Sequence, residues 1–340
     1  MLGLRDLDHL AARLHGRRGR LYDGARLRSL FALGSPGELA KAVFPGEGIA
    51  TAAGLERRLV ENFISENREI AACFGGARAG LLEWRAARFQ LENLKTIVRA
   101  LGSAAGAEEA GALFIDLPAG MEGYGGELAG IKTPEELLEA LPEGIFRNGL
   151  SAAFAEYPAR NQVFFREAAL ERDYLAEQTA RAAELSAKDR EAAGALCAQE
   201  TAAFNLALAA RGKFFYNYEN SDLLRLTAPC ADREARKFRA ILAAADLNEA
   251  AGIAAGLDAY PGTEPEGLEG LEALSRRRYR RLAVRALRND HLGFGAVAAY
   301  LALRRLETED LITVAEGLRL GAGAAELERR LLPGPEAAHV

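Results

Sequence analysis

Gly212-Lys213 is the pair in this sequence that comes nearest to a phosphate-binding loop. In such loops a serine or threonine after the lysine binds Mg²⁺, and a glycine five residues before the pair lets backbone N–H groups cradle the phosphates. Phe214 follows Lys213, and no glycine stands five residues before Gly212. The glycine clusters at 123–126 and 321–323 have no clear strand pattern before them and are predicted to be turns. We therefore predict that the chain has no nucleotide cofactor and does not hydrolyse ATP.

Histidines and cysteines, the usual zinc ligands, are few and scattered. They are His9, His15, His291, His339, Cys73, Cys197 and Cys230. No two histidines have the four-residue spacing that places both on one helix face, and no two cysteines form a C-x-x-C pair. His291 could be imagined as a general base, but its polar surroundings are more typical of a helix end. We predict no metal site, no catalytic residue and a reducing compartment for the cysteines.

The composition is that of a helical globular protein. Of 340 residues, 49% are hydrophobic, 27% charged and only 7% aromatic. Alanine, leucine, glutamate and arginine dominate, and all four are strong helix formers. The net charge of −5 comes from 48 acidic and 43 basic residues that are interspersed. No broad basic surface is therefore expected to hold a nucleic acid.

No segment has the character of a signal peptide or a membrane span. Residues 1–20 carry charges every few positions, where a signal peptide needs an uninterrupted apolar stretch. The longest apolar stretch, 293–303, is much shorter than the ~18 residues that suggest a membrane span. We expect a cytoplasmic protein whose contact with a membrane is peripheral.

Helix starts can be read directly from two short motifs. Ser35-Pro36-Gly37-Glu38 places a hydroxyl residue at the N-cap, proline at N1 and glutamate at N3 of a helix. Thr133-Pro134-Glu135-Glu136 has the same pattern. In each motif the hydroxyl and the glutamate are predicted to satisfy the free N–H groups of the first turn reciprocally.

Periodicity and punctuation extend this helical pattern along the chain. Within 81–101 the apolar residues advance by three and four positions and form one helical stripe; they are Leu91, Leu94, Val98 and Leu101. Predicted boundaries or rims are rich in glycine or proline; they are 102–130, 252–270, Pro229 and the run from Pro333.

A phrase that recurs three times predicts the domain organisation. Segments 93–99 and 205–211 share asparagine, leucine and arginine, and they lie 112 residues apart. A third copy at 310–316 begins 105 residues later. Two offsets near one third of the chain indicate three related helical units. We predict an all-α protein with units at 1–115, 116–225 and 226–340.

Several phrases resemble the family of the C-type coupling subunit of archaeal and bacterial V/A-type ATPases, whose vacuolar counterpart is the d-type subunit. They are ENLKTIVR at 92–99, the run 167–174 followed by 200–216, and 293–318. Together they span about 90–318, and the N-terminal part agrees only in its helical style and its Ser-Pro helix start. The chain departs from the pattern at Asp310 and Glu316, which replace the asparagine and arginine of the earlier copies, and at Ala203, where an acidic residue is usual.

The resemblance implies a funnel of three similar helical subdomains around a pseudo-threefold axis. It also implies a non-catalytic rotor component on the cytoplasmic mouth of the membrane proteolipid ring, with a cavity that receives the tip of a shaft formed by subunits D and F. The stator component in the membrane is a further partner that it allows. No small-molecule substrate is implied.

The repeated polar positions are the candidate site residues, and they are Asn93, Arg99, Asn205, Arg211 and Asp310. Asparagine and arginine stand six positions apart in a copy, so they lie on different parts of their helix. The structural interpretation is that asparagine bonds a neighbouring helix or backbone group while arginine pairs with a carboxylate at a subdomain junction. The functional interpretation places some of them in the shaft socket.

Other interpretations of the sequence remain open. A helical-repeat scaffold unrelated to ATPases would share the composition and the repeat. An all-α enzyme would need a deep pocket with converging titratable residues. The arginine-rich segment 276–288 is expected to be a solvated or salt-bridged helix face, with anionic lipid or an acidic protein surface as the alternative contact.

Overall fold

The computed structural model of the chain describes residues 4–103, 113–118, 120–159, 162–256 and 267–331. These residues form helices joined by turns and loops, and they contain no β-strand. The all-α prediction is therefore confirmed for them. The chain divides into two compact units, one made of Met1–Cys73 with Tyr279–Val340 and the other of Phe74–Arg278.

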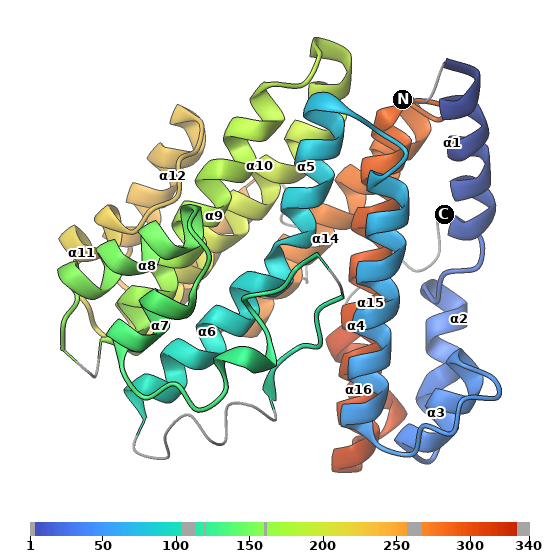
Figure 1. The fold of residues 1–340 in the computed structure, drawn as a ribbon, viewed down its shortest axis with the longest axis horizontal. Coiled ribbons are helices and arrows are strands. Elements are labelled where there is room, and N and C mark those ends of the chain that lie inside the picture. The colour runs from blue at the N-terminus through green and yellow to red at the C-terminus, as the bar shows by residue number, and fades with distance from the viewer. Residues whose placement is uncertain (1–3, 104–112, 119, 160–161, 257–266, 332–340) are drawn as a thin grey trace. The chain divides into compact units, whose positions relative to one another are not determined.

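The first unit is organised around one long buried helix, α15 (Phe294–Leu320). Its other helices are α1 (Leu4–Arg18), α2 (Gly24–Arg28), η1 (Ser29–Ala32), α3 (Pro36–Val43), α4 (Ala52–Ala71) and α16 (Ala324–Leu331). Both α1 and α4 pack along α15 (Figure 1). Apolar and small residues run continuously from Phe294 to Leu303, and a helix that is apolar all round is stable only when it is covered on several sides.

The second unit packs four helices against α9 (Val163–Ala183). These are α5 (Gly76–Ala86), α6 (Arg88–Gly102), α8 (Ile145–Glu156) and α10 (Ala187–Ala209). In the core between them, Trp84 stacks on Phe146 and on Tyr174, each at 5.4 Å between ring centroids. The indole Nε1 of Trp84 donates to the Tyr174 carbonyl at 3.0 Å, so the half-buried N–H has its partner.

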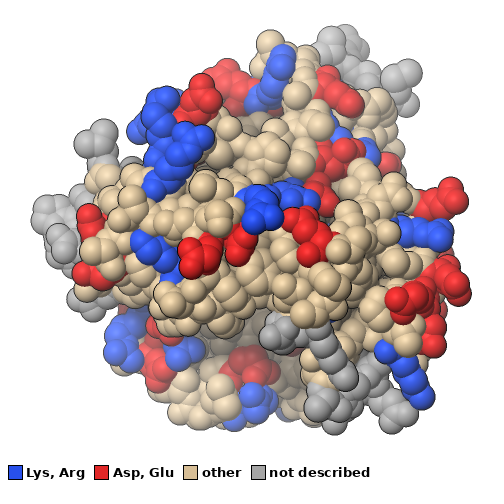
Figure 2. Space-filling view, turned by 90° about the vertical axis from the view of Figure 1, so that its left-hand side faces the viewer, with Lys and Arg blue, Asp and Glu red and all other residues tan. Residues whose placement is uncertain are grey.

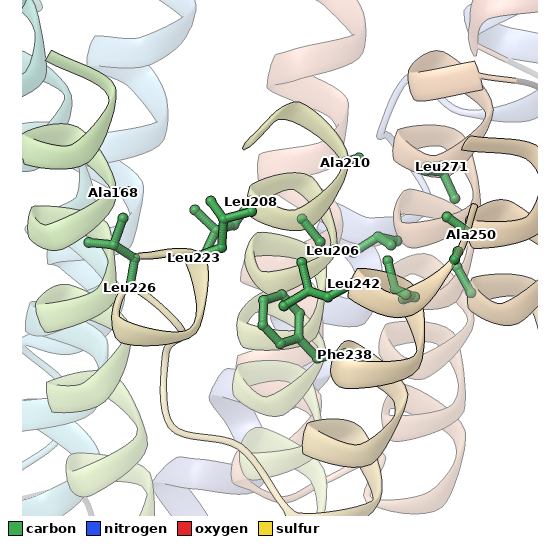
Figure 3. Close-up of a cluster of buried hydrophobic side chains, with 14 of the residues drawn as sticks. Ala168, Leu206, Leu208, Ala210, Leu223, Leu226, Phe238, Leu242, Ala250 and Leu271 are labelled. Carbon is green, nitrogen blue, oxygen red and sulfur yellow. The ribbon is translucent and has the colours of Figure 1, made fainter. Parts of the chain in front are cut away.

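A second core of this unit lies toward its C-terminal helices. Its elements are η4 (Ala210–Phe215), α11 (Asn220–Arg225), α12 (Asp232–Ala243), α13 (Leu247–Ala255) and the first part of α14 (Gly267–Asn289). Two shorter elements, η3 (Gly126–Leu128) and α7 (Pro134–Ala140), pack in the first core instead. Figure 3 shows Phe238 and Leu242 of α12 beside Leu206 of α10. These contacts fix which face of α12 is turned inward.

Both predicted helix starts are present. Ser35 accepts from the Glu38 N–H at 3.2 Å, and Thr133 accepts from the Glu136 N–H at 3.1 Å. The glutamates, however, do not return a bond to the N-cap residue. Each accepts from the N–H one position earlier, at Gly34 (2.7 Å) and at Lys132 (2.8 Å), so the capping contact holds the chain just before the helix.

The predicted stripe is one face of α6. Leu91, Leu94 and Val98 are completely buried, and Leu101 is half-buried at the end of the helix. The segment 81–101 is interrupted at Ala87, whose N–H lies 3.1 Å from the Glu83 carbonyl and 3.0 Å from that of Trp84. This tightened turn separates α5 from α6.

Both glycine clusters begin in turns, as the sequence predicts. Gly123 has φ +85° within a turn, and Gly321 has φ +75° at the C-terminal end of α15, where glycine is favoured. The run from Pro333, His339 and parts of the stretches 102–130 and 252–270 lie outside the described residues. Among the helices described, none is long and apolar enough to cross a membrane.

Candidate functional site

Asn93 is buried in α6 and holds a segment that follows 22 residues later. Its Oδ1 accepts from the Ile115 N–H at 2.8 Å, and its Nδ2 donates to the carbonyls of Ile115 (2.9 Å) and Tyr124 (2.8 Å). A primary amide has both donors and an acceptor, so it can pair with the N–H and the C=O of one residue as a strand neighbour would. The side chain thereby closes the loop after α6 onto its own helix.

Asn205 makes the same arrangement in α10. Its Oδ1 accepts from the Ala228 N–H at 2.9 Å, and its Nδ2 donates to the Ala228 carbonyl at 3.1 Å, 23 residues further along the chain. The first two copies of the repeated phrase therefore share a geometry as well as residue types. We call this arrangement the asparagine clamp.

The repeated arginines form ion pairs at the surface of the second unit. Arg99 lies 2.5 Å from Glu167, and Arg211 lies 2.7 Å from Glu272. Their side chains are 52% and 51% exposed, so each presents part of its guanidinium to solvent. Burial raises the pKa of Glu167, while Arg99 and Lys95 act in the opposite direction.

The third copy is built differently. Asp310 is completely buried in α15, and its carboxylate accepts from Arg280 at 3.2 Å. An ionised carboxylate has no donor, so it cannot pair with a backbone carbonyl as the asparagines do. Glu316, in the place of the repeated arginine, pairs with Arg319 one turn away at 2.7 Å.

The polar residues at the start of the 92–99 phrase take part in a charge network. Lys95 donates to Glu92 at 3.2 Å and to Glu171 of α9 at 2.9 Å. Arg88 pairs with the same two carboxylates and lies 3.0 Å from Glu92. The opposing charges lower the pKa of Glu92 although burial acts to raise it. These contacts join α6 to α9.

A group of aromatic residues, two exposed and two half-buried, lies where α10 ends, and we call it the aromatic surface. It consists of Phe164, Phe215, Tyr216 and Tyr218. Phe215 and Tyr216 are 59% and 56% exposed, which is unusual for large apolar side chains. The ring of Phe164 lies 5.2 Å from those of Tyr216 and Tyr218, so these three rings form one group, and Phe215 adjoins Tyr216 in the chain.

The backbone beneath the aromatic surface is a single π-helical segment, η4. Gly212 permits the close approach of α11 to this segment, because a Cβ at that position would lie 2.3 Å from a Leu223 side-chain carbon. Lys213 then donates from its Nζ to the Leu242 carbonyl at 2.6 Å and to that of Ala244 at the end of α12. Such π-helical segments are frequent at functional sites, and this one turns two aromatic side chains outward.

Two buried rings, those of Tyr157 and Phe165, pack against the aromatic surface on its inner side. Their rings stack at 5.1 Å, and Phe165 lies 4.5 Å from Tyr218. Burial, with a hydrogen bond to Glu156, raises the pKa of Tyr157 to about 12.

This pKa predicts a loss of stability in alkali. The unfolded chain releases the Tyr157 proton near its ordinary value of 10, whereas the folded chain retains it until about pH 12. The stabilisation is complete below pH 10 and is lost as the pH rises between these values, by on the order of 2 kcal/mol. Urea unfolding of the wild type at pH 9 and pH 11 measures the loss. Tyr157→Phe, which has no proton to release, should lose less, and an equal loss in both proteins would contradict the assignment.

The other residues considered for chemistry are dispersed. His291 is exposed in the turn between α14 and α15, where its backbone carbonyl lies 2.7 Å from His15 Nε2. Arg278 of the arginine-rich segment donates to the Ala254 and Ala255 carbonyls at the end of α13. Within the described residues no three His, Cys, Asp or Glu side chains are grouped so that they could hold a metal ion.

The second unit contains a small cavity among α10, α12, α13 and α14. Its volume is about 30 Å³, and it is lined by Gln199, Lys237 and Ser275, among others. Lys237 is directed to the Ala254 carbonyl at 2.6 Å. A space of this size holds about one water molecule, far less than the several hundred Å³ typical of ligand pockets.

Fold and site together define an all-α protein in which two buried asparagines clamp successive loops onto repeated helices. The sequence model of the ATP synthase (C/AC39) subunit family matches residues 10–330, and the chain belongs to this family. The resemblance of the three phrases is thereby confirmed, and the match extends into the N-terminal part that the phrases did not cover. No curated protein matches the sequence.

The aromatic surface is the feature that sequence reasoning missed. The run Lys213–Tyr216 stands out in the sequence only for its resemblance, and the signal that could have found it is three aromatic residues in succession at the end of a helical segment. Helical periodicity alone does not say which of the three aromatic side chains is exposed. Only the π-helical turn and the contact with α11 decide which of them face solvent.

Proposed function

We propose that this chain is the non-catalytic coupling component of a V/A-type ATPase or ATP synthase. In this role it joins the shaft formed by subunits D and F to the membrane proteolipid ring, on the cytoplasmic face of the membrane. The observation that carries the proposal is the family match over residues 10–330. It supports association with other subunits of the rotary complex and favours this role over an unrelated helical scaffold.

The proposed mechanism is mechanical and needs local rigidity. Torque transmission requires that loops do not yield when one end of the protein is turned. The asparagine clamps supply such stiffness, because each fixes a loop to a helix by hydrogen bonds that water cannot readily replace inside the protein. We further propose that three related units, with boundaries near 115 and 225, share this task.

Two kinds of surface suit two kinds of partner. The aromatic surface is proposed to contact the loops of the proteolipid ring, because exposed Phe and Tyr side chains are typical anchors of protein interfaces. Arg99 and Arg211 are half-exposed beside their carboxylate partners, and we propose them as polar positions that could face the shaft. In this assignment Asn93, Asn205 and Asp310 are structural.

Co-purification tests the proposed function. Tagged protein is recovered from its native membranes at moderate salt, and the bound proteins are identified by mass spectrometry. Recovery of the shaft subunits and the proteolipid is the expected result. Recovery of the chain alone, from membranes that contain an intact rotary ATPase lacking it, would show that the chain is a helical scaffold of another kind.

A double substitution tests the aromatic surface. Phe215→Ser with Tyr216→Ser is expected to reduce proteolipid recovery at least about tenfold, because two interface anchors are each worth more than about 1 kcal/mol. Leu320→Ser, at another apolar side chain that is 70% exposed, is the matched control and should leave recovery unchanged. Equal recovery with the double variant and the wild type would exclude the aromatic surface as the contact.

A further inference from the structure

The outer face of α12 carries three arginines at intervals of three residues. Arg233, Arg236 and Arg239 are all exposed. On a helix this spacing spans about 9 Å along the axis and places the three side chains in adjacent sectors of one face. We call this face the arginine stripe. Figure 2 views the side of the molecule on which Figure 1 shows α11 and α12.

The orientation of the arginine stripe is fixed by the opposite face of the helix. Phe238, Ile241 and Leu242 are buried against the second core of the unit. Lys237 adds a hydrogen bond to the end of α13 at 2.6 Å. Turning the stripe inward would expose these three apolar side chains, so the arginines are held at the surface by packing.

The three arginines lack the carboxylate partners that neighbouring arginines have. Arg211 pairs with Glu272 and Arg225 with Asp222, at 2.7 and 2.9 Å. Within the described part of the chain, no ion pair or hydrogen bond involves a side chain of the arginine stripe. No carboxylate of the described residues contacts them directly, although Asp232 is exposed on the same face and the whole chain carries a net charge of −5, so the face keeps an excess of positive charge for a partner.

Two classes of anionic partner, a lipid bilayer and a nucleic acid, fit the arginine stripe poorly. A bilayer would gain only about 1 kcal/mol from each arginine, and the exposed positions of α12 include no large apolar side chain that could anchor in lipid. Nucleic acid would need a broader basic surface than one helix face. In Figure 2 acidic side chains are interspersed with the basic ones, and no such field is visible.

An acidic helix fits this geometry better. Carboxylates at three- and four-residue intervals on a partner helix would oppose the arginines, and each guanidinium can pair with a carboxylate through two parallel hydrogen bonds. We propose that the arginine stripe docks an acidic helical segment of a neighbouring subunit. This inference rests on the proposed function, because it takes the partner to be another component of the rotary complex.

The test combines charge reversal with site-specific crosslinking in the assembled complex. A benzophenone amino acid is placed at Ala240, which is exposed and lies on the same face as Arg233 and Arg236. The matched control position is Ala140, exposed at the end of α7. We expect Ala240 to crosslink to an Asp- or Glu-rich peptide of another subunit, and Ala140 to give no such product.

Reversing the charges should remove that product. Arg233→Glu, Arg236→Glu and Arg239→Glu together are expected to lower the crosslink yield at least about tenfold at low salt, because like charges would then face each other. Replacing the same three residues by lysine keeps the charge and should preserve most of the yield. Far-UV circular dichroism of each variant checks that the fold is retained.

The outcomes separate this inference from the proposed function. If the wild type recovers the shaft subunits and proteolipid but Ala240 crosslinks to lipid, to nucleic acid or to nothing, the arginine stripe is not a protein docking site and the proposed function stands. If the Ala240 crosslink yield is unchanged after charge reversal, the arginine stripe is likewise not the docking site and the proposed function stands. If the wild type recovers no ATPase subunit, the proposed function fails and this inference fails with it.

Discussion

Asn93→Leu is expected to lower the free energy of unfolding by about 4 kcal/mol. The substitution leaves the Ile115 N–H and the carbonyls of Ile115 and Tyr124 without their partner inside the protein. Each buried polar group that loses its partner costs about 1–3 kcal/mol. Equilibrium urea unfolding, followed by far-UV circular dichroism, measures the loss.

A second asparagine provides the control for this prediction. Asn248 is exposed on α13, and Asn248→Leu should change stability by less than about 0.5 kcal/mol. Asn205→Leu, which breaks the equivalent clamp, should resemble Asn93→Leu rather than the control. If Asn93→Leu and Asn248→Leu had equal stabilities, the clamp would contribute nothing to the fold.

Arg304→Met is expected to have an effect of similar size, about 4 kcal/mol, in the first unit. Arg304 is buried and pairs with Glu66 at 3.1 Å and with Glu307 at 2.7 Å. Removing the cation leaves Glu307 buried without a positive partner, with only the Tyr22 N–H donating to it at 2.6 Å. Glu66 keeps Arg17 at 2.7 Å and the Tyr300 hydroxyl at 2.7 Å, so the cost falls mainly on Glu307. Breaking a buried pair from one side costs more than the pair itself contributes.

Arg319→Met is the matched control, since Arg319 lies on the same helix and pairs with Glu316 while remaining 54% exposed. Exposed pairs of this kind contribute less than about 1 kcal/mol.

The pH dependence gives a second readout of Arg304→Met. Burial already raises the pKa of Glu307, and loss of Arg304 should raise it further. The loss in free energy of unfolding is therefore largest at a pH where Glu307 is ionised in the unfolded chain. The loss should become smaller as the pH falls and Glu307 is protonated in both states. If the loss in free energy of unfolding does not depend on pH, it comes from lost packing and not from the charge of Glu307.

Local features of the fold could be predicted because their causes lie within a few residues. The N-caps Ser35 and Thr133 act on an N–H group three positions away. The stripe of α6 follows from the repeat of 3.6 residues per turn. Neither depends on the rest of the chain, and both predictions are confirmed.

The partners of the candidate residues could not be predicted. The repeat singled out Asn93 and Asn205, but not Ile115, Tyr124 or Ala228 as the groups that they hold. Those groups are backbone atoms, which leave no trace in residue type. In the same way, Asp310 stands out in the sequence only as a departure from the pattern, whereas its buried pair with Arg280 depends on how α14 meets α15.

By itself the sequence determined the helical class, the capped helix starts and the repeated phrases that identify the family, because each is encoded in short-range spacing or in residue identity. Only the tertiary structure decided which polar groups pair across long separations, such as Arg304 with Glu66, 238 residues apart. It also decided which apolar and basic side chains remain at the surface on η4 and α12. Those outcomes depend on which helix faces bury the most apolar area together, a property of the packed chain rather than of any segment.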